Sequence, residues 1–158
     1  MRVSIITVSD SVSAGKSEDR SGAALADRCR QLNWEVVSAS LVPDEESLIR
    51  TQIMALADSG KMDLILTTGG TGLGPRDVTP EATIAVTNKL VPGLAERMRQ
   101  VGCEKTPKAA LSRAVVGVRG TTLVVNLPGS PRGAVESLDA IADLLPHAIA
   151  VLHGARHD

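Results

Sequence analysis

Glycine and acidic residues are concentrated in residues 66–83, which read LTTGGTGLGPRDVTPEAT. Four glycines fall within six residues directly after an apolar run, so a stretch of backbone amides carries no side chains. Such amides can line a concavity for anionic oxygens, above all those of phosphate. Neither common phosphate motif fits. Pro75 and Arg76 follow Gly74 where a Walker A loop needs Lys and Ser or Thr, and Pro75 replaces the last glycine of G-x-G-x-x-G.

Asp77 follows this segment directly, although a carboxylate would repel a bound phosphate. A divalent cation between the two groups removes the repulsion, and Mg²⁺ is typically held by one or two carboxylates together with phosphate oxygens and water. Asp44, which follows a predicted strand in the segment VPDE, is the obvious second carboxylate. The two residues therefore predict a magnesium site at which phosphates are held in line for displacement.

Several of these polar residues also have a purely structural interpretation. Asp19, Asp44 and Ser130 stand where predicted helices begin, and an N-cap is worth ~1 kcal/mol. Asp77 has less reason to be a cap, because Thr79 is predicted to cap the helix that follows. A negative charge near a helix start is nevertheless stabilising. From the residues alone, both interpretations stay open.

The rest of the chain predicts the elements that must position these residues. Apolar β-branched runs favour strands, and apolar residues at helical spacing favour helices. In chain order we expect strand 3–9, helix 20–33, strand 35–42, helix 45–59, strand 63–68, helix 79–88, helix 93–101, a hairpin of 114–118 and 121–127, and helix 134–145 with a kink or new turn at Pro146. The alternation predicts right-handed βαβ crossovers. We therefore expect one α/β domain over residues 1–158, with three α/β/α layers, a mostly parallel sheet and a C-terminal β-hairpin.

Ligands of such folds bind beyond the carboxyl ends of the strands. Each predicted strand end is polar or rich in glycine, and the four segments concerned are 9–11, 43–45, 69–74 and 126–131. We expect these segments to converge on one rim of the sheet.

The composition excludes several classes of function. The chain has no Phe or Tyr and one Trp, so aromatic platforms for single-stranded nucleic acid are essentially excluded. A formal net charge of -1 indicates neither a DNA-coating surface nor an acidic tail. The sequence contains no signal peptide and no apolar stretch of about 20 residues, so no membrane contact is expected. Cys29 and Cys103 fit no disulfide framework or zinc motif, and we expect a reducing cytoplasm.

Eight segments taken together resemble one known family: TVSDSVSAG, DRSG, VPDE, DLILTTGGTG, PRDVTPEAT, LSR, VRGTTLVVNLPGSP and PHAI. They resemble the molybdopterin adenylyltransferases, a family that includes the G domains of gephyrin and its plant counterpart. The resemblance implies a three-layer α/β fold and a homotrimer. It implies a reaction in which the terminal phosphate of molybdopterin attacks the α-phosphate of Mg-ATP, giving adenylylated molybdopterin and pyrophosphate. It also implies a separate metal-insertion enzyme as partner, because the chain carries no fused domain for that step.

The resemblance also assigns roles to individual residues. It implies that Asp44 and Asp77 are catalytic, acting through magnesium. The residues implied to contact ligand phosphate are Gly69, Gly70, Thr71 and Gly72. Those implied to line the pterin and nucleotide pocket are Ser9, Asp10, Asp19, Ser21, Gly22, Asn126, Pro128, Gly129 and Ser130, with Ser112 as a further candidate. Because the attacking phosphate is already an anion, we expect catalysis by positioning and by charge neutralisation, to which Arg76 and the backbone amides contribute.

Two other functions remain as alternatives. Some homologues bind molybdopterin but transfer AMP poorly, and act as carriers or scaffolds; the presence of both Asp44 and Asp77 argues against this function. Domains of this fold also occur in hydrolases of nucleotide pyrophosphates, which usually carry an additional domain.

Overall fold

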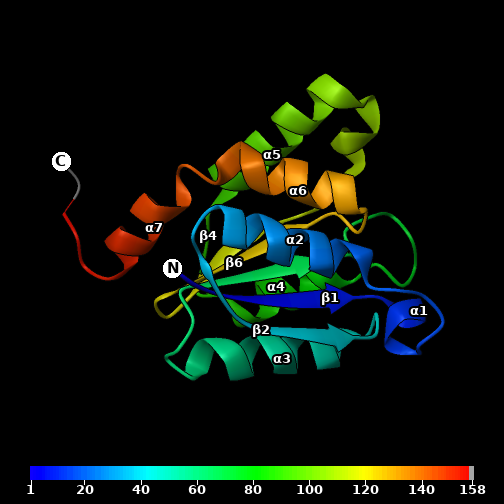
Figure 1. The fold of residues 1–158 in the computed structure, drawn as a ribbon, viewed down its shortest axis with the longest axis horizontal. Coiled ribbons are helices and arrows are strands. Elements are labelled where there is room, and N and C mark those ends of the chain that lie inside the picture. Colours follow the sequence, from blue (N-terminus) through cyan, green and yellow to red (C-terminus); the bar gives the residue numbers. More distant parts are fainter. Residues whose placement is uncertain (157–158) are drawn as a thin grey trace.

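Six strands form one sheet in the order β2-β1-β3-β6-β5-β4 in the computed structural model, which describes residues 1–156 (Figure 1). Strands β2 (Glu35–Val42), β1 (Arg2–Val8), β3 (Leu64–Thr68) and β6 (Thr122–Leu127) run parallel. Strands β5 (Val116–Arg119) and β4 (Lys89–Leu90) are antiparallel to their neighbours. The expected mostly parallel sheet with a β-hairpin is therefore confirmed.

The central strands are apolar on both faces, because helices cover both faces of the sheet. Val3 and Ile5 of β1 pack on one side with helix α2 (Arg20–Gln31), whereas Ile6 packs on the other side with α3 (Glu46–Asp58). The same alternation runs through β3 and β6. The core is therefore two aliphatic layers separated by the sheet, as a chain without Phe or Tyr requires.

Figure 1 shows the helical layers on either side of the sheet. One layer contains α2, α5 (Pro92–Lys105) and α6 (Pro131–Ile141), and the other contains α3 and α4 (Thr79–Val86). Helix α7 (Leu145–Leu152) continues from α6 toward the chain end. Among residues 1–156, no helix has the length and apolar character needed to cross a membrane.

The helix expected over residues 134–145 instead begins at Pro131 and ends at Ile141. Pro146 lies in the first turn of α7, as the expected new turn requires, but the break between the helices comes before it, at residues 142–144. The expected hairpin is present, and it closes with the two residues Gly120 and Thr121. Gly120 has φ 60°, a conformation that glycine adopts without strain.

Four short features differ from the sequence prediction. The two-residue strand β4, the four-residue helix α1 (Asp10–Ser13) and the 3₁₀ helix η1 (Pro107–Leu111) were not expected. The N-cap prediction for Thr79 is wrong, because Val78 occupies that position and Thr79 is the first residue of α4. The Thr79 hydroxyl instead donates a hydrogen bond of 2.9 Å to the carbonyl oxygen of Gly69, so tertiary contact overrides the capping preference.

Candidate functional site

The carboxyl ends of β1, β2, β3 and β6 lie along one edge of the sheet, because these four strands are parallel. The direction in which successive strands are added reverses at β1, because β2 lies on one side of β1 and β3 lies on the other. Such a reversal opens a crevice beyond the strand ends. A cavity of about 370 Å³ lies there, and its walls include Ser9, Asp19, Ser21, Asp44, Gly69, Gly70, Asp77 and Gly129. The structure thus brings together residues from all four predicted strand-end segments.

The glycine loop, defined as residues 69–78, connects β3 to α4. Gly69 and Gly70 have φ 105° and 70°, a region that other residues rarely adopt. A Cβ atom at Gly69 would also overlap the carbonyl oxygen of Val8, and one at Gly70 would overlap the hydroxyl of Thr79 and lie 3.2 Å from Oδ1 of Asp44. The loop therefore passes close to both β1 and Asp44 in a shape that only glycine permits.

Asp44 and Asp10 bind each other's backbone across two loops. Oδ2 of Asp44 accepts a hydrogen bond of 2.9 Å from the amide of Asp10, and Oδ1 of Asp10 accepts one of 3.0 Å from the amide of Asp44. The cap interpretation of Asp44 is wrong, because Glu45 is the N-cap residue of α3 and makes no side-chain cap bond. Asp10 also forms a two-bond ion pair with Arg76, at 3.0 and 2.9 Å, which joins the glycine loop to α1.

Asp77 turns its carboxylate back onto the glycine loop. Its Oδ2 accepts a hydrogen bond of 2.9 Å from the amide of Gly74. A Cβ atom at Gly72 or Gly74 would lie 2.9 or 2.8 Å from this oxygen, closer than real Cβ contacts allow. The Asp77 carboxylate can therefore take this position only because residues 72 and 74 are glycines.

The electrostatics around Asp44 bear on whether a cation fits. Burial raises the pKa of Asp44, and the negative charges of Asp10 and Asp77 raise it further, while the Asp10 amide and Arg76 act against this. The charges of Asp44 and Asp77 thus repel each other at the cavity wall, and a divalent cation would relieve that repulsion. No cluster of three or more His, Cys, Asp or Glu side chains suited to a metal occurs within residues 1–156. Two carboxylates without a complete protein cage fit Mg²⁺ that takes its remaining ligands from phosphate and water.

Asp19 and Ser130 are N-caps, as their structural interpretation predicted. The side chain of Asp19 accepts from the amide of Gly22 at 2.9 Å at the start of α2, and it also accepts a 2.9 Å hydrogen bond from Thr7. The side chain of Ser130 accepts from the amide of Gly133 at 3.1 Å at the start of α6. Asp19 also lies in the wall of the first cavity, so one residue both caps α2 and lines the cavity.

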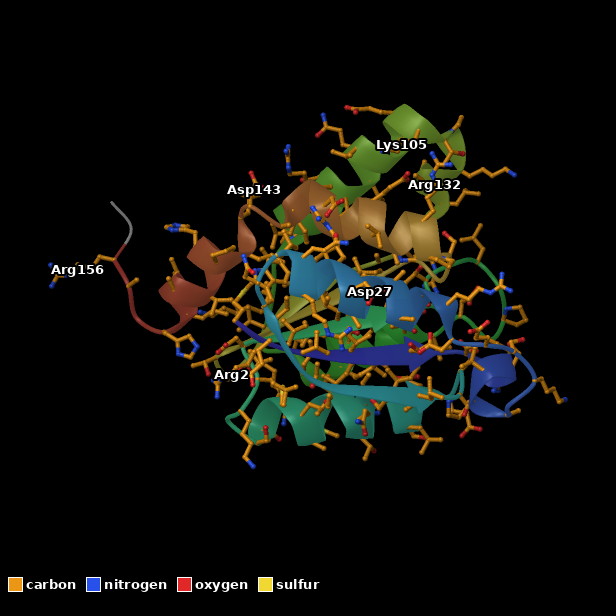
Figure 2. The ribbon with its side chains drawn as sticks, viewed as in Figure 1. Arg2, Asp27, Lys105, Arg132, Asp143 and Arg156 are labelled. Carbon is orange, nitrogen blue, oxygen red and sulfur yellow. The ribbon has the colours of Figure 1, made fainter. Side chains whose placement is uncertain are left out.

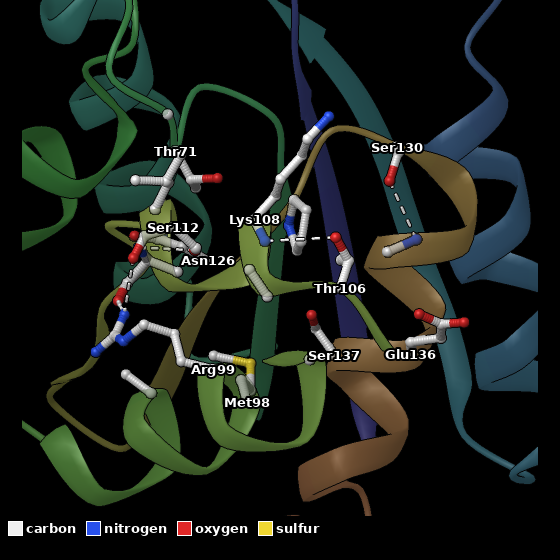
Figure 3. A pocket seen from close by; sticks show the side chains of 18 residues that line it. Thr71, Met98, Arg99, Thr106, Lys108, Ser112, Asn126, Ser130, Glu136 and Ser137 are labelled. Atoms are coloured by element: carbon white, nitrogen blue, oxygen red, sulfur yellow. Dashed lines mark hydrogen bonds between the residues drawn. The ribbon is translucent and has the colours of Figure 1, made fainter. Parts of the chain in front are cut away.

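A second cavity of about 300 Å³ adjoins the same sheet edge (Figure 3). The predicted residues in its wall are Thr71, Gly72, Ser112, Asn126, Pro128 and Ser130. Asn126 is fully buried: its amide nitrogen donates to Thr67 and Thr83, and its Oδ1 accepts from the amide of Val115. Asn126 therefore ties β6 to β3, α4 and the segment before β5.

Sequence reasoning missed one whole wall of this cavity. Figure 3 shows Met98 and Arg99 of α5, Lys108 of η1, and Glu136 and Ser137 of α6 around the space. Arg99 donates to the carbonyl oxygens of Ser112 and Ala114, at 3.3 and 2.8 Å. The basic residues Arg99 and Lys108 were visible in the sequence, but nothing in their spacing indicated that α5 and η1 fold over the strand ends.

Comparison with known proteins agrees with this geometry. Residues 4–147 match the family described as "probable molybdopterin binding domain". The molybdopterin adenylyltransferase of Helicobacter pylori J99 is 36% identical over 98% of this chain and 89% of its own. That of Escherichia coli K12 is 37% identical over 98% of this chain and 79% of its own. The crystal structure of the molybdopterin biosynthesis enzyme MoaB from Thermus thermophilus is 51% identical, covers 99% of both chains and superposes with a TM-score of 0.92. The chain therefore belongs to the molybdopterin-binding family that includes the molybdopterin adenylyltransferases.

Proposed function

We propose that the protein is a molybdopterin adenylyltransferase, which transfers AMP from Mg-ATP to the terminal phosphate of molybdopterin and releases pyrophosphate. The observation that carries this proposal is that the glycine loop contributes to both cavities: Gly69 and Gly70 to the first, Thr71 and Gly72 to the second. Two substrates that react through their phosphates need two adjoining spaces with a phosphate-binding segment between them. The names of the curated relatives support the same reaction.

In the proposed reaction, an oxygen of the molybdopterin phosphate attacks the α-phosphorus of ATP, and the bond from that phosphorus to the bridging oxygen of pyrophosphate breaks. The attacking group is already an anion, so no strong base is needed. The glycine-loop amides donate hydrogen bonds to phosphate oxygens. Arg76, which is paired with Asp10 and lines neither cavity, adds positive charge from outside the cavity walls. Asp44 and Asp77 would hold Mg²⁺, which neutralises the phosphates when bound. The fixed backbone keeps the reacting groups in line.

The remaining wall residues are assigned by position. We infer that the nucleotide lies in the first cavity, against Ser9, Ser21 and Gly129. Molybdopterin lies in the second, where Arg99 and Lys108 offer positive charge beside Ser112 and Ser130. We further propose a homotrimer in the cytoplasm that passes its product to a separate metal-insertion enzyme, with no nucleic acid or membrane as partner.

The direct test is to incubate the purified protein with molybdopterin, ATP and Mg²⁺. We expect pyrophosphate release and an adenylylated pterin, identified by mass, in equal amounts. A protein that binds molybdopterin tightly yet releases no pyrophosphate would be a carrier, and the proposed transfer would be wrong. Pyrophosphate or phosphate release from a nucleotide without any adenylylated pterin would favour the hydrolase alternative instead.

A further inference from the structure

Arg113 lies between η1 and β5. It binds the glycine loop through its backbone amide and its side chain, which no motif in the sequence indicated. Its amide donates a 2.9 Å hydrogen bond to the carbonyl oxygen of Thr71. Its guanidinium donates through Nε to the carbonyl oxygen of Gly72 and through Nη2 to that of Asp77, both at 2.7 Å. One side chain thus binds both ends of the turn that runs from Gly72 to Asp77.

Glu81 completes the arrangement from the first turn of α4. Nη1 of Arg113 donates to its two carboxylate oxygens at 2.6 and 3.1 Å. All three guanidinium nitrogens are therefore engaged, and the planar fork has a fixed orientation. Hydrogen bonds from a charged donor are shorter and stronger than neutral ones, which suits the short distances observed.

The turn that Arg113 binds carries two of the residues proposed to act on phosphate, Arg76 and Asp77. Residues 73–76 are exposed, with Leu73 68% accessible, so packing alone does little to fix this turn. Arg113 itself is not part of the wall of either cavity. Its effect on a bound ligand must therefore pass through the backbone that it holds.

We propose that Arg113, oriented by Glu81, is a positioning residue that fixes the turn from Gly72 to Asp77 and so sets the rate of phosphate chemistry at the site. Only the part of this inference that concerns the rate rests on the proposed AMP transfer. A displacement of about 1 Å in a reacting group can lower a rate about 100-fold. Loss of the Arg113 hydrogen bonds to this turn should therefore lower kcat more than it weakens substrate binding.

The test compares Arg113→Gln and Arg113→Lys with a matched control, Arg119→Gln. The guanidinium of Arg119 also binds a carboxylate, that of Asp58, at 2.8 and 2.9 Å, and a helix carbonyl, that of Val86, at 2.9 Å. Arg119 lies at the amino ends of the parallel strands, opposite to the ends that carry the cavities. We expect Arg113→Gln to lower kcat about 100-fold, with KM for ATP changed less than tenfold. Arg113→Lys, which keeps the charge but not the fork, should fall between wild type and Arg113→Gln. Arg119→Gln should lose similar stability and keep wild-type kcat.

Hydrogen exchange of the unliganded protein provides a readout that does not depend on turnover. Amides of residues 72–79 should exchange faster in Arg113→Gln than in the wild type, and not in Arg119→Gln. Unchanged exchange there, or a kcat that falls equally in Arg113→Gln and Arg119→Gln, would overturn the proposal. If the wild type itself transfers no AMP, the proposed function fails, and the exchange data still decide whether Arg113 fixes the turn.

Discussion

Asp77 serves the backbone and the proposed chemistry with the same carboxylate. The Asp77→Asn variant keeps an oxygen that can accept the hydrogen bond from the Gly74 amide, so the loop should fold as before. It removes the negative charge that the magnesium assignment requires. We expect an unchanged melting temperature by circular dichroism and a loss of AMP transfer of about 100-fold or more. Full turnover of this variant would contradict the assignment of Asp77 as a magnesium ligand.

Asp44 should behave differently, because its charge destabilises the folded chain. Burial, with the charges of Asp10 and Asp77, raises its pKa, so the folded state holds this proton more tightly than the unfolded state does. Its contribution to stability therefore falls as pH rises above the unfolded value of about 3.9. At pH 7, Asp44→Asn should melt at the same or a higher temperature than the wild type while losing AMP transfer. The stability difference should shrink as pH approaches 4, and a lower melting temperature at pH 7 would contradict this account.

At the scale of the elements, the sequence correctly predicted those strand and helix bounds that local residue patterns determine. Strand β2 was predicted with its observed bounds, because its flanking residues interrupt an apolar β-branched run. Helix α2 was predicted to begin at its observed first residue, since Asp19 is a cap that lies next to that residue. Helix η1 and strand β4 could not be predicted, because five and two residues carry too little periodicity.

Arg2 and Asp63 join β1 to the start of β3 at the amino edge of the sheet. Arg2 lies at the end of β1 that is away from α1 (Figures 1 and 2). Asp63 accepts from the Arg2 backbone amide at 2.7 Å and from its guanidinium at 3.0 Å, and His153 lies 3.4 Å away. The Arg2 side chain lowers the pKa of Asp63, with further help from the Arg2 amide and His153. The ion pair therefore stabilises the fold above the unfolded pKa of about 3.9, and the stabilisation is lost as pH falls through the lower folded value.

Replacement of Asp63 should reveal this pH dependence. We expect Asp63→Asn to lower the free energy of unfolding at pH 7 by about 1.5–3 kcal/mol, the range for hydrogen bonds to charged groups. Urea unfolding of both proteins between pH 7 and pH 2 measures the difference, which should disappear at the acidic end. AMP transfer should be unchanged at pH 7, because the site lies at the other edge of the sheet. A difference that is constant over the whole pH range would show that the pairing is not ionic.

At the scale of the whole molecule, the convergence of the strand ends was predictable, whereas the closure of the second cavity was not. Parallel strands put their carboxyl ends on one edge, so Asp44, Gly69 and Gly129 could be grouped from topology alone. The wall formed by α5 and η1 depends on how a long helix packs across the molecule. Arg113 belongs to the LSR segment, but its role could not be predicted, because its partners in the glycine loop are backbone carbonyls that no residue type reveals.

The proposed trimer can be tested by sedimentation at micromolar concentration. The edge strand β2 exposes Val37 and Leu41 at 43% and 48%, and contact between copies would remove such apolar surface from water. We expect a mass three times the 16.5 kDa of one chain, independent of dilution over that range. A mass of one chain would contradict the trimer and leave the AMP-transfer proposal to its own assay.

Strand β6 is the last strand within residues 1–156, yet it occupies an inner place in the sheet, between β3 and β5. During synthesis β1, β2 and β3 emerge first, and the edge of β3 has no partner until residues 122–127 leave the ribosome. A half-made chain therefore exposes an open, aliphatic strand edge that other nascent chains can join. Both cavities also need residues made after β6, so neither cavity can hold its substrate before the first turns of α6 have left the ribosome.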